Sequence, residues 1–455
     1  MEDTIVAIST AIGTGGIGII RMSGEKCFEI LDKIFVPKNK KKEIKGYTLK
    51  YGIIKENDEV VDEVLVSFFV KPNSYTKENM CEINTHGGIV VERRILQLCI
   101  KYGAEMAAPG EFTKRAFLNG RIDLSQAEAV MDLINSKSEM EARESAAQLE
   151  GKLSSEIRKI ESIILKVMTS IEVTIDYPEY DIEEVKDVDI VQNLNKAKDE
   201  LQSIVNNFEN GKIIKEGIKT VILGKPNAGK SSLMNTILDE DRAIVSSIEG
   251  TTRDTIEEYV NIRGIQLKLI DTAGIRETNN EIEKIGVVKA KRLAGEADLI
   301  IAIFDISDEI DDKDLKIIDI IRDKKSIILL NKIDIKEKNN KMEEIFKKTN
   351  KPIIKISAKN NMGIDILYDK IIEMFNLGKI ESNKKMVVTN DRHKALLIKA
   401  KNNIEKAINE LNENIPIDIC SVYIREGLQN LGEILGENIS EEIINEIFKN
   451  FCLGK

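Results

Sequence analysis

The stretch from Thr220 to Ser231 reads TVILGKPNAGKS, and it decides how the middle of this chain folds. An apolar run leads directly into Gly224-Lys225-Pro226-Asn227-Ala228-Gly229-Lys230-Ser231, the G-x-x-x-x-G-K-S phosphate-binding loop between a predicted strand and a predicted helix. Glycines let backbone N–H groups close around phosphate oxygens, Lys230 reaches the β- and γ-phosphates, and the Ser231 hydroxyl binds Mg²⁺. The bare pattern also arises by chance in roughly a few per cent of chains this long, so a glycine turn with a solvated lysine is the alternative.

Later motifs exclude that alternative. The run from Ile265 to Ile270 has the apolar pattern of a strand and ends at an acidic residue, with a glycine placed to sense a γ-phosphate. Two apolar runs, Ser326 to Leu330 and Pro352 to Ile356, also read as strands, each followed by a polar loop. In chain order the motifs are Gly250-Thr251-Thr252-Arg253-Asp254, Asp271-Thr272-Ala273-Gly274, Asn331-Lys332-Ile333-Asp334 and Ser357-Ala358-Lys359.

The order and spacing of these motifs resemble those of Ras-like GTPases. The resemblance implies that Asp334 accepts the N1–H and exocyclic amine of guanine, that Asn331 braces the loop, and that Ala358 contributes a backbone N–H. GTP rather than ATP is therefore the expected nucleotide. One position departs from the Ras pattern, because Ile275 stands where a glutamine would orient the attacking water. Groups outside that position must then assist hydrolysis.

Composition limits the class of protein. A chain of 455 residues is too long for one core, and its net charge of −10 gives no global basic field for nucleic acid. Five scattered cysteines without a C-x-x-C motif argue for reduced thiols and against a zinc site. The sequence has no apolar stretch long enough to span a membrane and no export signal, so a cytoplasmic protein without membrane contact is expected.

The segments on either side of the GTPase segment differ in their predicted secondary structure. Short β-like runs before residue 118 predict an α+β domain. Beyond it, a predicted capping box from Ser125 to Glu128 opens a long helical region, and a further helical run ends at Gly211. Helical sequence patterns occur again near the C-terminus. They predict one helical domain interrupted by an inserted α/β domain; two independent helical domains are the alternative. The expected boundaries are 1–118 (α+β), 119–214 (helical, first part), 215–378 (Ras-like G domain) and 379–455 (helical, second part).

Three features outside the GTPase segment can be interpreted either as structural or as functional. The glycine cluster from Gly13 to Gly18 favours a tight turn over a second nucleotide site. A lone histidine such as His86 is more often structural than catalytic. Cys452 near the C-terminus is expected to be an incidental, half-buried thiol, because no histidine lies near it in sequence to lower its pKa.

The whole chain resembles the MnmE/TrmE family of bacterial tRNA-modification GTPases. Departures from the family pattern are small: Leu453 replaces a usual isoleucine, Thr14 stands where arginine is common, and Ser246 where threonine is frequent. Besides the GTPase motifs, the resembling blocks are Asp3-Thr4-Ile5-Val6, Gly16 to Gly24, Thr85-His86-Gly87-Gly88, Pro109 to Arg121, Asp123 to Ala129 and the terminal Cys452-Leu453-Gly454-Lys455.

The resemblance implies how hydrolysis proceeds without the glutamine. In this family a K⁺ ion takes the place of an arginine finger, and G domains pair across a homodimer. K⁺ would be held by Asn227, Ser246, Ile248 and Thr251, and Mg²⁺ by Ser231 and Thr252. Glu283 would position the water, with Lys230 as the other catalytic residue. The implied GTP contacts are Asn227, Ala228, Gly229, Lys230, Ser231, Ser232, Ser246, Ser247, Ile248, Gly250, Thr251, Thr252, Asp271, Thr272, Ala273, Gly274, Asn331, Lys332, Asp334, Ser357, Ala358 and Lys359.

For the N-terminal domain, the resemblance implies a folate site and the constitutive dimer contact. Arg21, Glu82, Arg121 and Lys455 match the folate-contacting positions, the folate being 5-formyl- or 5,10-methylene-tetrahydrofolate. The implied function is GTP-dependent modification at C5 of the wobble uridine of certain tRNAs, in a complex with the flavin-dependent protein MnmG. A ribosome-assembly GTPase and a one-carbon transferase acting alone are the competing functions.

Overall fold

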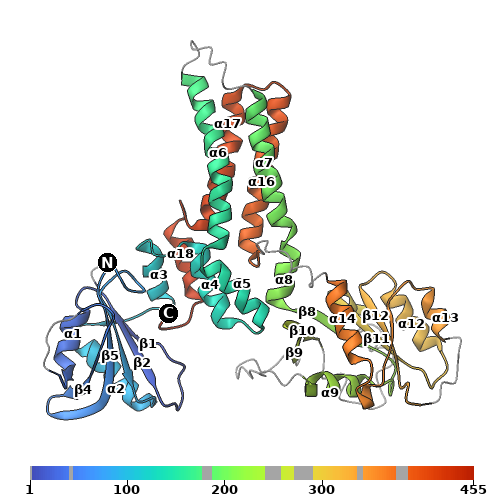
Figure 1. The fold of residues 1–455 in the computed structure, drawn as a ribbon, viewed down its shortest axis with the longest axis horizontal. Coiled ribbons are helices and arrows are strands. Elements are labelled where there is room, and N and C mark those ends of the chain that lie inside the picture. Colours follow the sequence, from blue (N-terminus) through green and yellow to red (C-terminus); the bar gives the residue numbers. More distant parts are fainter. Residues whose placement is uncertain are drawn as a thin grey trace. The chain divides into compact units, whose positions relative to one another are not determined.

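The computed structural model describes residues 3–39, 45–176, 187–240, 258–270, 291–335, 342–375 and 388–455. The chain divides into two compact units (Figure 1). The first combines residues 1–135, 145–198 and 396–455, and the second combines 136–144 and 199–395. The first unit is therefore interrupted in sequence by the second, although the individual domain boundaries given above stay predictions.

The N-terminal part of the first unit is a seven-stranded sheet in the order β3-β4-β5-β6-β2-β1-β7, antiparallel except for the β1–β7 pair. Buried and exposed side chains alternate along the strands and so define the face that forms the core. Along β5, Val64, Val66 and Phe68 are buried, while Leu65 is exposed. Helices α1 and α2 pack on the buried face. The elements are β1 Ile5–Ile8, β2 Gly18–Ser23, α1 Cys27–Ile34, β3 Phe35–Pro37, β4 Thr48–Glu56, β5 Glu59–Phe69, β6 Met80–Thr85, α2 Ile89–Lys101 and β7 Glu105–Met106.

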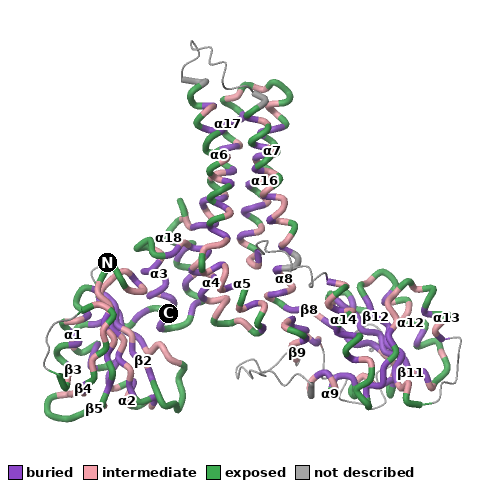
Figure 2. The backbone as a smooth tube through the Cα atoms, viewed as in Figure 1, coloured by how far each residue is buried: buried purple, intermediate pink, exposed green. Residues whose placement is uncertain are grey.

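The rest of the first unit is helical, as predicted. Buried residues recur every three or four positions along α6, and this stripe packs against α17 from the far end of the chain (Figure 2). Pro416 separates α16 from α17, and Ser440 precedes α18. The helices are α3 Glu111–Leu118, α4 Leu124–Asn135, α5 Glu139–Leu149, α6 Lys152–Asp176, α7 Asp187–Asn206, α16 Asp391–Asn412, α17 Ile417–Leu435 and α18 Glu441–Lys449, with parts of α5, α7 and α16 belonging to the second unit.

Two predicted helix boundaries are wrong. The capping residue of α4 is Asp123, not Ser125: Asp123 Oδ1 accepts the N–H of Gln126, and Gln126 Oε1 accepts the N–H of Asp123, both at 3.0 Å. The helical run also does not end at Gly211. It passes through α8 (Phe208–Glu216) and ends at Gly217, whose positive φ of +76° is a backbone angle that glycine adopts at low cost.

The second unit contains a six-stranded sheet in the order β13-β12-β11-β8-β10-β9, parallel except for β9 at the edge. The central strands are apolar along their whole length because helices cover both faces: α9 and α14 on one, α12 and α13 on the other (Figure 1). This is the predicted Ras-like α/β fold. Its elements are β8 Ile218–Leu223, α9 Lys230–Glu240, β9 Glu258–Ile262, β10 Ile265–Leu269, β11 Leu299–Asp305, α12 Asp312–Ile321, β12 Ser326–Asn331, α13 Met342–Lys347, β13 Ile353–Lys355 and α14 Ile364–Met374.

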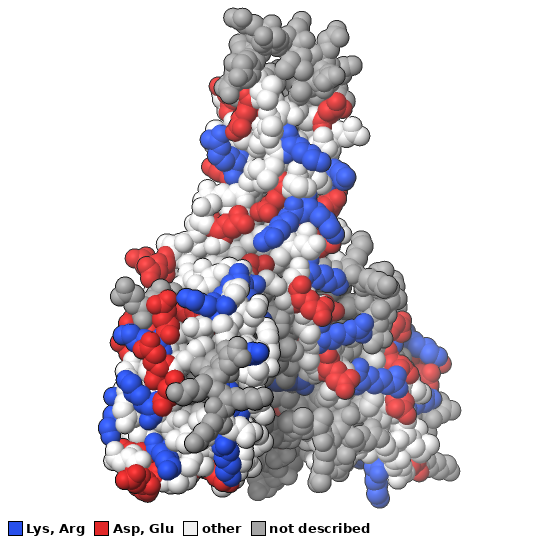
Figure 3. Space-filling view, turned by 60° about the vertical axis from the view of Figure 1, so that its left-hand side comes forward, with Lys and Arg blue, Asp and Glu red and all other residues white. Residues whose placement is uncertain are grey.

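The surface agrees with the composition. On the face drawn in Figure 3, the described Lys and Arg side chains are interspersed with Asp and Glu and do not form one broad basic field. Among the helices that the structure describes, none is long and apolar enough to cross a membrane.

Candidate functional sites

The phosphate-binding loop lies between β8 and α9, where the sequence predicts it. Asn227 and Gly229 both adopt left-handed backbone conformations, with φ of +66° and +101°. A Cβ atom on Gly229 would lie 2.0 Å from Asn331 Nδ2, so this position requires glycine for space as well as for conformation. Ser231 and Ser232 occupy the first turn of α9, at the end of the helix that favours anions.

The Lys230 side chain is held inside this loop. Its ammonium donates to the carbonyl oxygen of Gly224 at 2.8 Å and to that of Lys225 at 2.7 Å. Burial lowers the pKa of Lys230, because the loop carbonyls solvate the cation less well than water does. A phosphate oxygen would supply the negative charge that the carbonyls lack, so the loop is built to accept an anion.

Asn331 joins the phosphate loop to the loops that follow β12 and β13. Its Nδ2 donates to Ala228 O at 2.8 Å, and its Oδ1 accepts the N–H of Ala358 at 3.0 Å. That N–H, which the Ras resemblance assigns to the base, is thus donated to Asn331 in this structure. Beside it, Ser357 Oγ donates to Asp334 Oδ1 at 2.6 Å and lowers the pKa of Asp334, which keeps this carboxylate ionised as an acceptor.

Of the other predicted nucleotide ligands, only Lys332 and Lys359 lie within the described residues; the remaining nucleotide, magnesium and potassium ligands lie outside them, and so does the predicted water-positioning residue. Lys359 follows Ala358 and is exposed, and Lys332 has a left-handed backbone with φ of +69°. The residues outside the described ranges are Ser246, Ser247, Ile248, Gly250, Thr251, Thr252, Asp271, Thr272, Ala273, Gly274 and Glu283.

A second cluster forms in the first unit, around Tyr75. Arg21 Nη2 pairs with Glu82 Oε1 at 2.8 Å across neighbouring strands, and its Cζ lies 5.5 Å from the Tyr75 ring centre. Arg121 Cζ lies 4.6 Å from the same ring centre, within cation–π range. The structure therefore brings together the residues predicted for folate from four separate segments, together with an aromatic ring that sequence reasoning missed.

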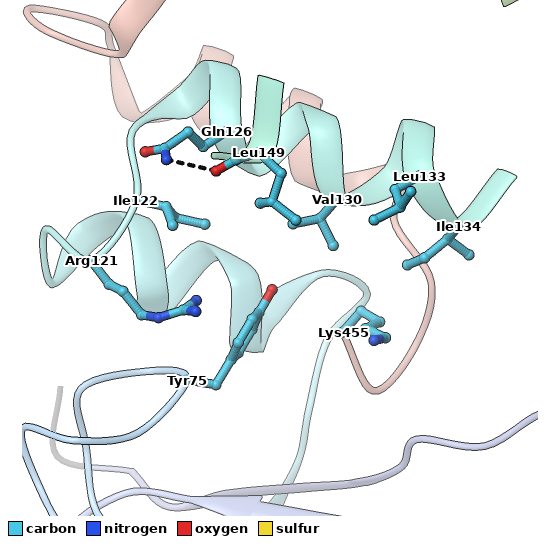
Figure 4. Close-up of a pocket in the computed structure, with 9 residues that line it drawn as sticks. All are labelled: Tyr75, Arg121, Ile122, Gln126, Val130, Leu133, Ile134, Leu149 and Lys455. Carbon is cyan, nitrogen blue, oxygen red and sulfur yellow. Dashed lines mark hydrogen bonds between the residues drawn. The ribbon is translucent and has the colours of Figure 1, made fainter. Parts of the chain in front are cut away.

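A pocket of about 390 Å³ opens beside this ring. Figure 4 shows Tyr75 between Arg121 and Lys455, facing a wall of apolar side chains from α4 and α5. Burial lowers the pKa of Lys455, and the nearby positive charge of Arg21 lowers it further. The pocket thus joins an apolar wall to the cationic side chains of Arg121 and Lys455. Its lining residues are Tyr75, Arg121, Ile122, Gln126, Val130, Leu133, Ile134, Leu149 and Lys455.

The C-terminal tail is anchored at this pocket. The Gly454 carbonyl accepts hydrogen bonds from Ser9 Oγ at 3.0 Å and from Arg21 Nη1 at 3.1 Å, and the Gly110 N–H donates to Cys452 O at 3.2 Å. These bonds place Lys455 in the pocket wall. The Cys452 side chain is exposed, so the expectation of a half-buried thiol was wrong.

A mainly parallel sheet with a phosphate loop after β8, the Asn331–Asp334 loop at the end of β12 and the Ser357–Lys359 loop after β13 defines a GTP-binding protein of the P-loop class. Residues 4–121 match the GTP-binding protein TrmE N-terminus, and residues 124–452 match the MnmE helical domain. The chain therefore belongs to the MnmE family of tRNA modification GTPases.

Curated relatives agree over the full length. The tRNA modification GTPase MnmE of Acetivibrio thermocellus is 50% identical over 100% of this chain and 99% of its own length. The proteins of that name from Finegoldia magna and Clostridioides difficile are each 46% identical, over 100% of both chains. Among solved structures, the G domain of the T. maritima FeoB iron transporter matches 34% of this chain and 97% of its own at 25% identity, with a TM-score of 0.26. At that TM-score the likeness says nothing further about the chain.

Family membership makes this protein a tRNA modification GTPase. The family membership therefore argues against the competing function, a ribosome-assembly GTPase. It also argues against a one-carbon transferase acting without GTP, because the relatives named as GTPases match the chain from end to end.

Proposed function

We propose that this protein is a potassium-dependent GTPase that works with the flavin-dependent protein MnmG. The pair would add an aminomethyl or carboxymethylaminomethyl group to C5 of the wobble uridine of certain tRNAs. The carbon would come from 5-formyl- or 5,10-methylene-tetrahydrofolate bound in the Tyr75 pocket. Hydrolysis would drive a cycle in which the G domains of a homodimer close and reopen.

The observation that carries this proposal is the pocket that contains Tyr75, Arg121 and Lys455. A reduced folate has a flat ring system, an apolar linker and at least two carboxylates, and when bound it would supply the one-carbon unit. The pocket offers an aromatic ring, the apolar wall of α4 and α5, and cations for the carboxylates. Glu82, held by Arg21, presents a carboxylate that accepts N–H groups. The residues present therefore fit a folate.

Replacing Arg121 by alanine tests the folate proposal. In the proposed complex, the Arg121 guanidinium faces a folate carboxylate in a partly buried pocket. Its loss is expected to raise the Kd for 5-formyl-tetrahydrofolate by about tenfold. Isothermal titration of the full chain measures this, with Arg93→Ala as the matched control, because Arg93 is an exposed arginine on α2. If the wild-type chain does not bind the compound, or if both variants bind like the wild type, the pocket is not a folate site.

The proposed homodimer has support in the sheet of the first unit. On the face opposite α1 and α2, Leu49, Tyr51 and Leu65 remain 58%, 43% and 41% exposed, and Tyr51 and Leu65 are cross-strand neighbours. Exposed apolar clusters of this kind mark protein interfaces. A second copy of the chain is the occupant we propose for this face.

The proposed potassium site uses Asn227. Its side chain is exposed at the open side of the phosphate loop and has no hydrogen-bond partner among the described residues, so the amide oxygen is available to a cation. A K⁺ ion bound there would supply positive charge between the β- and γ-phosphates, as an arginine finger does. Ser246, Ile248 and Thr251 would complete its ligands, Ser231 and Thr252 would hold Mg²⁺, and Glu283 would position the water.

GTP turnover should therefore depend on the salt. We expect the wild-type chain to hydrolyse GTP at least ~10-fold faster in KCl than in NaCl at equal ionic strength, because the finger-like charge is a large part of catalysis. Asn227→Ala should remove this difference. Asn350→Ala is the control, since Asn350 is also an exposed asparagine with positive φ but lies after α13. Equal rates in both salts for the wild type would show that Asn227 is only a loop residue.

A further inference from the structure

A strongly acidic segment follows β11, and the mechanism described above does not use it. Residues Asp305–Asp314 read DISDEIDDKD, and we call them the acidic segment. It begins at the carboxyl end of β11, between β8 and β12 in the sheet, and it ends in the first turn of α12. Its position therefore places it between the phosphate loop and the loop that carries Asp334.

One end of the acidic segment holds the phosphate loop. Lys225 Nζ lies 2.8 Å from Asp314 Oδ2, 3.3 Å from Asp311 Oδ2 and 3.6 Å from Asp308 Oδ2. The side chains of Lys225 and Asp314 are only 11% and 3% exposed. Asp314 Oδ2 also accepts the N–H of Asp311, so its position is set by the start of α12. The backbone carbonyl of Lys225 in turn accepts the Lys230 ammonium, so this ion pair bears directly on the lysine that meets the phosphates.

The other end of the acidic segment holds the Asn331–Asp334 loop. Lys332 Nζ lies 2.5 Å from Asp305 Oδ2, and Asp305 Oδ1 accepts both the hydroxyl and the N–H of Ser307. The N–H of Ile306 donates to the carbonyl of Asn331 at 3.1 Å. Lys332, in its left-handed conformation, is thus tied at its side chain, while the preceding residue is tied at its backbone.

We propose that the acidic segment is a positioning element that fixes the phosphate loop and the Asn331–Asp334 loop relative to each other. In this role Asp314 acts through Lys225 on the phosphate contacts, and Asp305 acts through Lys332 on the contacts to the base. Asp314→Asn would take from the largely buried Lys225 ammonium the nearest of its three carboxylates. Asp305→Asn would take from Lys332 its ion-pair partner. In each case the lysine loses the contact that fixes its position and would move. Such a movement would displace each loop from its ligand. The proposal rests on the nucleotide site described above.

The test compares the binding of GDP and IDP by the full chain, using isothermal titration. IDP lacks the exocyclic amine of guanine. The Kd for IDP divided by the Kd for GDP therefore reports contact with the base. Asp314→Asn should raise both Kd values by about tenfold and leave their ratio unchanged. Asp305→Asn should lower the ratio by about fivefold, because the loop with Asp334 loses its tie. The matched control is Asp312→Asn, which removes an exposed carboxylate of the same segment.

Two further variants keep the result interpretable. Lys225→Arg retains the charge opposite Asp314 and should bind GDP within about twofold of the wild type. Lys225→Met breaks the same pair from the loop side and replaces Asp314→Asn if that variant does not fold. If Asp305→Asn and Lys225→Met both bind like Asp312→Asn, the positioning role is wrong although the nucleotide site stands. If the wild-type chain binds no GDP, the nucleotide site itself is wrong.

Discussion

Lys230→Ala is expected to abolish GTP hydrolysis, with a fall in kcat/KM of at least ~10³-fold. The ammonium already lies inside the phosphate loop, where it donates to the carbonyls of Gly224 and Lys225, and burial lowers its pKa. Negative charge that develops on the phosphates in the transition state is stabilised by this cation, whereas the two carbonyls repel it. The effect therefore falls on transition-state binding more than on folding.

Steady-state hydrolysis of GTP by the full chain measures this effect. Lys348→Ala is a suitable control because Lys348 is an exposed lysine beyond α13 in the same unit. Thermal unfolding of both variants without nucleotide should give midpoints close to the wild type, since Lys230 contributes a desolvated charge and not a packed apolar group. A Lys230→Ala variant that retained a tenth or more of the wild-type kcat/KM would contradict the role given to this lysine.

Asp334→Asn is expected to weaken GDP binding by about 100-fold and to favour XDP instead. A carboxylate accepts two hydrogen bonds from the N1–H and the exocyclic amine of guanine. The asparagine amide accepts only one and turns a donor towards the other, which suits the second oxo group of xanthine. The Ser357 hydroxyl, which donates to Asp334 Oδ1, would keep the new side chain in the same orientation.

Competition between GDP and XDP measures the change, and Asp323→Asn serves as the control because it removes an exposed carboxylate after α12. The pH dependence has a defined sign. The Ser357 hydrogen bond lowers the pKa of Asp334, so the carboxylate stays ionised as the pH falls from 8 towards 5, and this group should cause no loss of GDP affinity there. An unchanged preference for GDP in Asp334→Asn would place base recognition elsewhere.

Local patterns in the sequence were reliable where backbone geometry follows from a few consecutive residues. The phosphate loop is such a case, because Gly229 and the Lys230–Ser231 pair act within one turn between β8 and α9. Helix limits were less reliable. The sequence predicted Ser125 as the capping residue of α4, whereas the structure has Asp123. Several polar residues there can cap a helix, and only the packed helix selects one of them.

The sequence by itself predicted the order of the domains and the P-loop class of the G domain, and it proposed which residues meet the nucleotide. These depend on short motifs whose chemistry is local. Only the tertiary structure decided that Tyr75 stands between Arg121 and Lys455, and that Lys225 and Lys332 are held by the two ends of one acidic segment. Such contacts join residues far apart in the chain. They arise from how strands and helices pack, and no spacing along the sequence encodes the distance between their side chains.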